Sequence, residues 1–476
     1  MKPISVQEIV EATNGKLIAG RSEDTVTVIT TDSRVIPENA LFVPIVGERM
    51  DGHDFLMKAV QAGAKCVLTS RASVDGLYDE SGAEESAGNC AIVLVQDTIT
   101  ALQKVGKLHR SKLTLPCIGI TGSVGKTTTR EMVSAALASQ KSVFKTDKNY
   151  NNKIGVPLTL SEMTDDYDFG VLELGLNVRD ELGTISELTN IETCMITNIG
   201  VAHIEFYGTK DEICKEKFTV TKGFRKENPA PKMMFLNGDD PYLLKYKDLT
   251  GFPYTTYAVS NQEADYAAQN IRYVNDKTAF TLMKKGKAIL EVTLSVLGLH
   301  NVLNAVGALA VCDYYGLDLE KAQEGLSKFS GFAHRLQRFE KDGALYIDDT
   351  YNASPQSMKA GIDVLESLVY GDNEGDKLLV LGDMFELGEN GPAYHREVGE
   401  YAAKKNFTKM LLAGELSKNI EDAYRENGGT REVVRFETAE ELEAELRKTL
   451  KPGDVAYFKA SHGMHFSDMV DRLLGK

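Results

Sequence analysis

The chain has 476 residues, and at the usual size of roughly 100–200 residues per domain this length predicts about three domains. Its 69 Asp and Glu residues outnumber 54 Lys and Arg residues, giving a formal net charge of −15, which argues against nucleic acid as a partner. No apolar stretch of about 18 residues and no secretory signal occur, so we expect a cytoplasmic protein without membrane insertion. The six cysteines form no C-x-x-C pair, which argues against a zinc site and a disulfide framework.

The first part of the chain mixes β-type and helical patterns. Strands are predicted over residues 26–31, 40–46, 66–70 and 91–96, helices over 55–62 and 98–110, and an exposed loop over 81–88. We expect an α/β domain over residues 1–110.

The next region opens with an apolar strand over 115–121 and a helix over 129–137, followed by strands over 170–174 and 194–199. Regular alternation of this kind predicts a mostly parallel sheet with helices on both faces. We expect this central domain to cover residues 111–331.

The last region repeats the same alternation. Strands are predicted over 345–348, 377–382, 410–414 and 455–459, and helices over 356–368, 395–405 and 439–450. We expect a third α/β domain over residues 332–476.

A glycine-rich turn follows the first strand of the central region and reads Gly119-Ile-Thr-Gly-Ser-Val-Gly-Lys-Thr-Thr128. The strict G-x-x-x-x-G-K-[ST] pattern is not met, because Ile120 stands where the first glycine belongs, but Gly122 and Gly125 still bracket the turn. Glycines let backbone N–H groups face a phosphate, and the following helix N-terminus favours an anion. Lys126 is then suited to the β- and γ-phosphates and the Thr127 hydroxyl to Mg²⁺. The segment predicts a nucleoside triphosphate site.

Three polar residues follow strand ends in the same region, namely Glu173, Asn198 and His203. A lone Glu or His is usually structural, but ligands of open parallel sheets bind beyond the carboxyl ends of the strands. We therefore expect these three residues to lie at the same edge as the phosphate loop. The N-K-x-D motif of GTP switches is absent, which weakens that alternative.

Taken together, the ordered motifs resemble those of the Mur ligases of peptidoglycan synthesis over nearly the whole chain. Besides the phosphate loop, they are Thr31-Asp-Ser-Arg34, Gly47-Glu-Arg-Met-Asp-Gly-His-Asp-Phe55, Asn149-Tyr-Asn-Asn-Lys-Ile-Gly-Val-Pro-Leu158, Leu299-His-Asn-Val-Leu-Asn304, His334-Arg-Leu-Gln337, Asp348-Asp-Thr-Tyr-Asn-Ala353 and Leu381-Gly-Asp-Met-Phe-Glu-Leu-Gly388. The resemblance implies an N-terminal UDP-binding α/β domain, a central P-loop domain with a parallel sheet, and a C-terminal Rossmann-like domain.

The resemblance also implies roles for single residues. ATP would be bound by Gly122, Ser123, Gly125, Lys126, Thr127, Thr128, Asn301, Arg335 and Asp349, and two Mg²⁺ ions by Thr127, Glu173, His203 and Lys217. Catalysis would depend on Lys126, His203, Lys217 and Arg335. From the sequence alone, Lys217 would be a solvated surface lysine. The resemblance to the family implies instead that Lys217 is carbamylated. Addition of CO₂ converts the cation into a carboxylate, which can ligate Mg²⁺.

The implied substrates are UDP-MurNAc-tripeptide, held by Ser33, Arg34, Asn149 and Asn152, and D-Ala-D-Ala. The implied reaction is amide ligation by a monomer through an acyl phosphate, with hinge closure of the third domain on ATP. Another Mur-type or folylpolyglutamate-type ligase and a regulatory P-loop ATPase remain alternatives.

The chain departs from the family pattern at Thr219 in place of Glu, Asp180 in place of Gly, Ser354 in place of Asn and His462 in place of Arg. These departures bear on contacts to the incoming dipeptide and leave the residues expected to bind ATP and metal intact.

Overall fold

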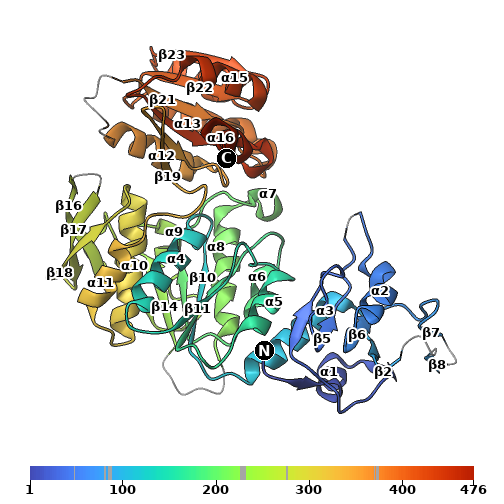
Figure 1. Ribbon diagram of the computed structural model, residues 1–476. Coiled ribbons are helices and arrows are strands. Elements are labelled where there is room, and N and C mark those ends of the chain that lie inside the picture. Colours follow the sequence, from blue (N-terminus) through green and yellow to red (C-terminus); the bar gives the residue numbers. More distant parts are fainter. Residues whose placement is uncertain are drawn as a thin grey trace. The chain divides into compact units, whose positions relative to one another are not determined.

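The protein is described by a computed structural model covering residues 1–47, 49–79, 82–83, 88–225, 232–274, 277–368, 370 and 375–476 (Figure 1). It is an α/β protein with sheets of five, nine and six strands and two small two-stranded sheets. The chain divides into two compact units, which are Met1–Ile120 with Lys141–Cys194 and Thr219–Met233, and Thr121–Gln140 with Met195–Phe218 and Met234–Lys476. The boundaries at 110 and 331 stay a prediction.

The N-terminal sheet has the strand order β2-β9-β6-β5-β4. These strands are β2 (Lys16–Ala19), β9 (Ala91–Leu94), β6 (Cys66–Thr69), β5 (Ala40–Phe42) and β4 (Val28–Thr30). All neighbours are parallel except β2 and β9. The predicted strand over 26–31 is split, because β3 (Thr25–Val26) pairs with β1 (Ile4–Ser5) while β4 joins the larger sheet.

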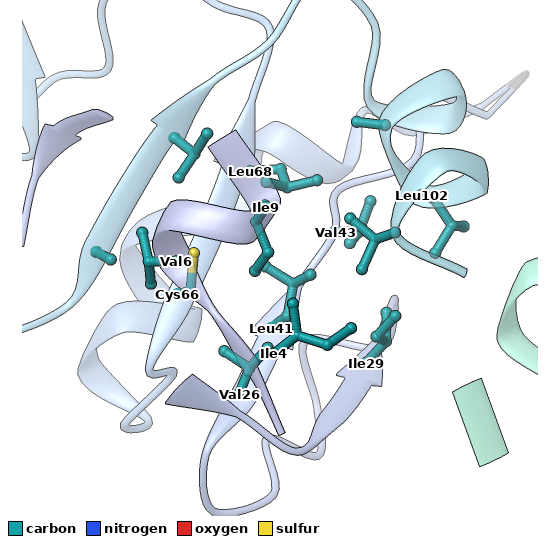
Figure 2. Close-up of a cluster of buried hydrophobic side chains, with 14 of the residues drawn as sticks. Ile4, Val6, Ile9, Val26, Ile29, Leu41, Val43, Cys66, Leu68 and Leu102 are labelled. Carbon is teal, nitrogen blue, oxygen red and sulfur yellow. The ribbon is translucent and has the colours of Figure 1, made fainter. Parts of the chain in front are cut away.

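One core of this region lies between the sheet and two helices, α1 (Val6–Thr13) and α3 (Thr98–Ser111). Figure 2 shows Ile9 of α1 and Leu102 of α3 with the strand residues Leu41 and Leu68 in this cluster, and all four side chains are fully buried. Burial of aliphatic side chains contributes about 1.5–3 kcal/mol each, so this cluster is a main source of the region's stability.

The predicted helices over 55–62 and 98–110 are confirmed as α2 (Leu56–Gln61) and α3. The loop predicted over 81–88 falls mostly outside the described residues, and residues 82–83 form β8 (Gly82–Ala83), which pairs with β7 (Tyr78–Asp79).

The motif between residues 47 and 55 is held by a polar network. His53 is buried, with Nδ1 2.6 Å from Asp51 Oδ1 and Nε2 3.1 Å from both the N and the Oγ of Ser70. Arg71 donates to both Asp51 and Asp54. These contacts tie the motif to the end of β6.

The end of α3 is fixed by two buried basic side chains. His109 Nδ1 lies 2.8 Å from the Leu160 carbonyl oxygen, and its Nε2 accepts a hydrogen bond from the Lys2 N–H at 2.9 Å. Burial lowers the pKa of His109 to about 4, so the ring is neutral at pH 7. The Arg110 guanidinium donates to the backbone carbonyls of Leu113, Leu115, Thr189 and Asn190.

The nine-stranded sheet has the order β11-β12-β10-β13-β14-β15-β16-β17-β18. Its strands are β10 (Cys117–Thr121), β11 (Val143–Lys145), β12 (Phe169–Glu173), β13 (Thr193–Ile196), β14 (Met233–Asn237), β15 (Tyr254–Ala258), β16 (Tyr266–Val274), β17 (Lys277–Lys284) and β18 (Lys287–Leu294). The strands predicted over 115–121, 170–174 and 194–199 are confirmed as β10, β12 and β13. The pairs β16–β17 and β17–β18 are antiparallel, so the sheet is mixed.

Helices of this region are α4 (Lys126–Ala138), α5 (Gly155–Glu162), α6 (Glu181–Ser186), α7 (Ile204–Tyr207), α8 (Lys210–Phe218), α9 (Pro241–Tyr246), α10 (Leu299–Tyr314) and α11 (Leu319–Ser327). The helix predicted over 129–137 is confirmed, but α4 begins three residues earlier, at Lys126. α4 packs against α10 and α11 in the second unit (Figure 1).

The C-terminal sheet has the order β19-β20-β24-β21-β22-β23 and is parallel except for the pair β19–β20. Its elements are β19 (Gln337–Lys341), β20 (Ala344–Asp348), α12 (Pro355–Ser367), β21 (Lys377–Leu381), α13 (Gly391–Ala402), β22 (Lys409–Ala413), α14 (Lys418–Glu426), β23 (Glu432–Phe436), α15 (Ala439–Thr449), β24 (Val455–Lys459) and α16 (Phe466–Leu474). All four predicted strands and all three predicted helices are present. Within the described residues, no helix is both long and apolar enough to cross a membrane.

Candidate functional site

The phosphate loop connects β10 to α4. Gly122 has φ 148° and Gly125 has φ 84°, a left-handed conformation that only glycine adopts without strain. A Cβ on Gly122 would stand 1.9 Å from Thr197 Oγ1, so the close approach of the loop to β13 requires glycine there. Gly125 is the N-cap of α4, which places Lys126, Thr127 and the half-buried Thr128 in the first turn of the helix.

Residues after β13 hold the loop in this shape. Asn198 accepts a hydrogen bond from the Val124 N–H at 3.0 Å and donates one to the Val124 carbonyl at 2.8 Å. Thr197 Oγ1 donates to the same carbonyl at 2.6 Å. The Gly200 N–H donates to Ser123 Oγ at 2.8 Å. Asn198, predicted to be near the loop, therefore helps to fix the loop backbone together with Thr197.

Lys126 and Thr127 both have polar partners at the loop. The Lys126 ammonium donates to the Gly122 carbonyl at 2.9 Å, so it folds back over the glycine turn. Thr127 Oγ1 accepts a hydrogen bond from Arg335 Nη2 at 3.0 Å. The structure thus brings together three residues that the sequence predicted for one site.

Two further basic residues predicted for the site are His203, which is half-buried, and Lys217, which is buried. His203 has φ 63°, and its Nδ1 lies 3.3 Å from a carboxylate oxygen of Glu386. Burial, with the charges of Lys126 and Lys217, lowers the pKa of His203 to about 4, so the ring is neutral at pH 7.

Lys217 lies on α8 with only 1% of its surface exposed, so the surface lysine expected from the sequence alone is in fact buried. Burial and the neighbouring Lys126 cation lower the pKa of Lys217 well below its ordinary value. Within the described part of the chain, no hydrogen-bond acceptor is found for its ammonium. Burial therefore favours the neutral amine of Lys217 over the ammonium.

Glu173 ends β12 in the first unit, where it is paired across the strands with Ile120 of β10. Its side chain is 2% exposed and accepts a hydrogen bond from Asn151 Nδ2 at 2.8 Å. Asn151 belongs to the 149–158 motif but was not predicted as a site residue. The spacing of the sequence does not show which asparagine of this motif contacts Glu173.

Residues 295–297, which precede α10, line a cavity of about 350 Å³. The start of β19, Ile347 and Val364 also line this cavity. Asn301 donates to the carbonyl of Leu297, which lines the cavity. Asn304, one turn later, accepts a hydrogen bond from Thr129 Oγ1 of α4 at 3.1 Å. This second asparagine was quoted in the motif but not predicted as a site residue.

Asp349 follows β20 and is already bound by two C-terminal residues. Lys459 Nζ lies 2.5 Å from its Oδ2, and the Tyr457 hydroxyl donates to the same oxygen at 2.8 Å. The preceding Asp348 is fully buried and lies 2.7 Å from His334 Nδ1. The contacts of Lys459 and Tyr457 are both to Oδ2 of Asp349.

The residues predicted to hold the UDP substrate lie in the first unit. Arg34 is exposed and forms a bidentate pair with Asp32, which lowers the pKa of Asp32 to about 2. Ser33 is half-buried and Asn149 is exposed. Asn152 Oδ1 accepts the N–H groups of Ile154 and Gly155 at the start of α5, so this side chain has a local structural use.

The four departures from the family pattern lie at defined places. Asp180 has φ 62°, in the left-handed region that glycine adopts most easily. This conformation explains why glycine would be favoured at position 180 and means that Asp is less favourable there. Ser354 caps α12 by accepting the Ser357 N–H. Thr219 begins a 3₁₀ turn directly after α8, and His462 is exposed with its ring 6.3 Å from that of Tyr351.

The expected metal donors do not form a ready-made site of acidic and histidine side chains. Among the residues that the structure describes, no group of three or more His, Cys, Asp or Glu side chains could hold a metal. The expected set includes only two residues of these types, Glu173 and His203. A cation there would also require the Thr127 hydroxyl, a modified Lys217 or ligand oxygens.

Comparison with known proteins gives the same family along the chain. The family model "Mur ligase family, catalytic domain" matches residues 25–110, "Mur ligase middle domain" matches 120–312 and "Mur ligase, glutamate ligase domain" matches 334–462.

Curated relatives cover nearly the whole chain. The UDP-N-acetylmuramoyl-tripeptide–D-alanyl-D-alanine ligase of Bacillus subtilis is 34% identical over 99% of this chain and 98% of its own length. The enzyme of the same name from Escherichia coli is 31% identical over 89% of this chain and 88% of its own.

Solved structures have the same fold. MurF from Acinetobacter baumannii is similar with a TM-score of 0.87 at 28% identity, covering 100% of both chains. The MurF ligase from Thermotoga maritima, solved in complex with ADP, gives a TM-score of 0.80 at 26% identity and covers 94% of this chain and 96% of its own. Because a relative above 30% identity spans the full length, the chain belongs to the Mur ligase family.

Proposed function

We propose that this protein is an ATP-dependent, ADP-forming ligase that joins D-Ala-D-Ala to UDP-MurNAc-tripeptide in peptidoglycan precursor synthesis. The observation that carries the proposal is the full-length similarity to ligases whose names state this reaction, at 34% identity in the Bacillus subtilis relative. The phosphate loop adds independent support, because Gly122, Gly125 and Lys126 suit a nucleoside triphosphate. The site would lie in the cytoplasm, where ATP is available, and the protein would act as a monomer.

The reaction requires activation of a carboxylate. In the first step a carboxylate oxygen of the tripeptide attacks the γ-phosphorus of ATP, the bond to the β-phosphate oxygen breaks, and ADP leaves. In the second step the amine of D-Ala-D-Ala attacks the acyl carbon, phosphate leaves, and a proton is lost from nitrogen. Such transfers depend on positioning and charge neutralisation rather than on a covalent protein nucleophile.

The ATP phosphates would be bound by the loop and the first turn of α4. The backbone of Gly122, Ser123 and Gly125 would face the phosphates, and Lys126 would exchange the Gly122 carbonyl for phosphate oxygens. The base would be bound near Asn301, whose amide donates to the carbonyl of Leu297, a residue that lines the cavity. Arg335 would neutralise charge at the transferred group, since it already reaches Thr127.

Magnesium would be held by Thr127, Glu173, His203 and Lys217. The chemistry of these donors fits: His203 is neutral, so its nitrogen can ligate, and the Glu173 carboxylate is buried and anchored by Asn151. When bound, Mg²⁺ supplies charge neutralisation of the phosphate oxygens.

Lys217 would act in the carbamylated form. An ammonium repels a cation, but the neutral amine attacks CO₂, forming an N–C bond and releasing one proton to give a carboxylate on a long arm. The burial of Lys217 and the lowered pKa of its amine favour this neutral form. The modification would replace the electrostatic repulsion between Lys126 and Lys217 with an attraction.

The tripeptide substrate would be bound by Ser33 and Arg34 of the N-terminal region together with Asn149 and Asn152. Arg34 would exchange its exposed pairing with Asp32 for the substrate diphosphate. Closure of the C-terminal domain on ATP would seat Asp349 and Arg335 at the nucleotide, and small-angle scattering should then show compaction on nucleotide binding.

An acceptor panel tests the proposal. Phosphate release from ATP and UDP-MurNAc-tripeptide should require D-Ala-D-Ala and should not occur with diaminopimelate, lysine or glutamate. Lys126→Ala should abolish release while circular dichroism and thermal unfolding stay unchanged. Release that is independent of any acceptor would instead support a regulatory ATPase, and release with glutamate would support a different amide ligase.

A further inference from the structure

Arg335 lies against the ring of Tyr351, a residue of the 348–353 motif for which the sequence predicted no role. Its guanidinium carbon is 4.0 Å from the centre of the Tyr351 ring, well inside the range of about 6 Å in which a cation is attracted to an aromatic face. A planar guanidinium also stacks on such a face, which an ammonium does not do. Tyr351 is therefore a defined contact of the residue that reaches the phosphate loop.

The backbone places this ring under Arg335. The Tyr351 N–H donates to the His334 carbonyl at 3.1 Å, and the His334 ring lies 2.7 Å from the buried carboxylate of Asp348. These two contacts fix the segment after β20 against the residue that precedes Arg335. The backbone of Tyr351 is thus held beside His334, the residue that precedes Arg335.

The chain at Arg335 has an unusual conformation. His334 and Leu336, its two neighbours, have φ of 57° and 53°, in the left-handed region that few non-glycine residues adopt. Such a conformation persists only where surrounding contacts determine it. It directs Arg335 to the loop, where Nη2 donates to Thr127 Oγ1 at 3.0 Å.

We propose that Tyr351 is a positioning residue that holds the Arg335 guanidinium in the orientation that reaches Thr127 and the nucleotide phosphates. The proposal rests on the function proposed above. A long arginine side chain loses considerable rotamer freedom when it is fixed in one place, and the ring reduces that cost by holding it there before ATP binds. The required feature is the aromatic face, and the phenol hydroxyl is dispensable.

A double-mutant cycle in the full-length enzyme tests the proposal. The dissociation constant for a non-hydrolysable ATP analogue is measured by calorimetry for wild type, Tyr351→Leu, Arg335→Ala and the double variant, together with kcat/KM for ATP where turnover remains. Tyr351→Leu should weaken binding about 3- to 30-fold. In the Arg335→Ala background the same change should have less than about a twofold effect, because the ring then has no cation to hold.

Two conservative changes separate the aromatic face from packing. The dissociation constant of Tyr351→Phe for the ATP analogue should stay within about twofold of the wild-type value. Substitution of 3,4,5-trifluorophenylalanine at position 351 keeps the ring shape but removes the negative charge from its face. This protein should lose affinity for the analogue as Tyr351→Leu does. The series also keeps the test valid if Tyr351→Leu unfolds, which thermal unfolding would detect.

Two results would overturn the proposal. The first is that Tyr351→Leu weakens binding of the ATP analogue equally in the wild-type and Arg335→Ala backgrounds, which would make Tyr351 a merely structural residue. The second is that the fluorinated protein binds the analogue with wild-type affinity while Arg335→Ala binds it weakly. Failure of the proposed function is distinguishable, because wild-type enzyme would then release no D-Ala-D-Ala-dependent phosphate.

Discussion

Arg335 Nη2 donates a hydrogen bond to Thr127 Oγ1 at 3.0 Å, joining residues that are 208 positions apart in the chain. Thr127 belongs to the first turn of α4, directly after the glycine loop, and Arg335 precedes β19. The contact places a permanent cation at the end of the phosphate loop, where a nucleotide's terminal phosphates would lie.

Replacing this cation should lower turnover strongly. We expect Arg335→Ala to reduce kcat/KM for ATP about 10²- to 10³-fold, since charge on the transferred phosphoryl group would lose its partner. Arg335→Lys should recover part of the loss, because it keeps the charge but not the planar fork. Arg21→Ala is the matched control, as Arg21 is exposed and pairs only with nearby Glu23. Equal activity of Arg335→Ala and Arg21→Ala in a steady-state assay would contradict this role.

The carbamate at Lys217 leads to a rescue experiment. Lys217→Ala should be inactive, and small carboxylic acids such as acetate or propionate at high concentration should restore part of the activity by supplying the missing carboxylate. Lys215→Ala is the control, because Lys215 lies on the same helix but is exposed and paired with Glu212. Wild-type activity of Lys217→Ala without any added acid would rule the carbamate out.

The shape of the phosphate loop should depend on Asn198. Asn198→Ala removes the hydrogen bonds to both the N–H and the carbonyl of Val124, which should cost about 1–2 kcal/mol of stability. We expect ATP affinity to fall about tenfold with little change in the KM for D-Ala-D-Ala, as measured by calorimetry and kinetics. Asn198→Asp, which keeps the acceptor but not the donor, should lie between; an unchanged ATP affinity in both variants would show that the loop is held by other contacts.

Stability below neutral pH should report on His109. Its pKa is lowered from 6.5 to about 4 in the folded protein, so the unfolded chain binds more protons between these two values. The contribution of this residue is therefore complete above pH 6.5 and is lost as the pH falls toward 4, by roughly 3 kcal/mol at most. Urea unfolding of the wild type and of His109→Gln, which does not titrate, should show a shallower pH slope in the variant.

His465→Gln is the control for this measurement, since the His465 side chain is 74% exposed and its ring contacts only Asp468 in the described structure. Identical slopes for wild type and His109→Gln would show that the buried ring does not resist protonation.

Local sequence patterns were sufficient for much of the fold. Apolar runs located β10, β12 and β24 to within one or two residues, because buried strands of parallel sheets are short and continuously apolar. The helix α1 was not predicted, although Ser5 and Glu8 form a capping box that is recognisable from the sequence. The antiparallel strands β16 to β18 were also missed, although buried positions alternate along β18 from Leu290 to Leu294; in β16 a register shift between Gln269 and Arg272 interrupts the pairing with β17.

The candidate site, like the fold, could be predicted only in part from the sequence. Glycines of the loop could be predicted because their conformational requirement is local. The contacts of Asn304 with Thr129 and of Tyr351 with Arg335 could not, because they depend on how distant segments pack. Lys217 is the clearest case: nothing in its neighbourhood in the sequence predicts burial, and only the family resemblance directed attention to it.

The central claim is that ATP activates a carboxylate by forming an acyl phosphate. The direct measurement uses UDP-MurNAc-tripeptide with ¹⁸O at both oxygens of its reacting carboxylate and determines the mass of the released phosphate in the presence of ATP and D-Ala-D-Ala. Each released phosphate should carry one ¹⁸O atom, because the carboxylate oxygen that attacked phosphorus stays bonded to it when the amine displaces the phosphate. Unlabelled phosphate, released at the same rate as product, would contradict it.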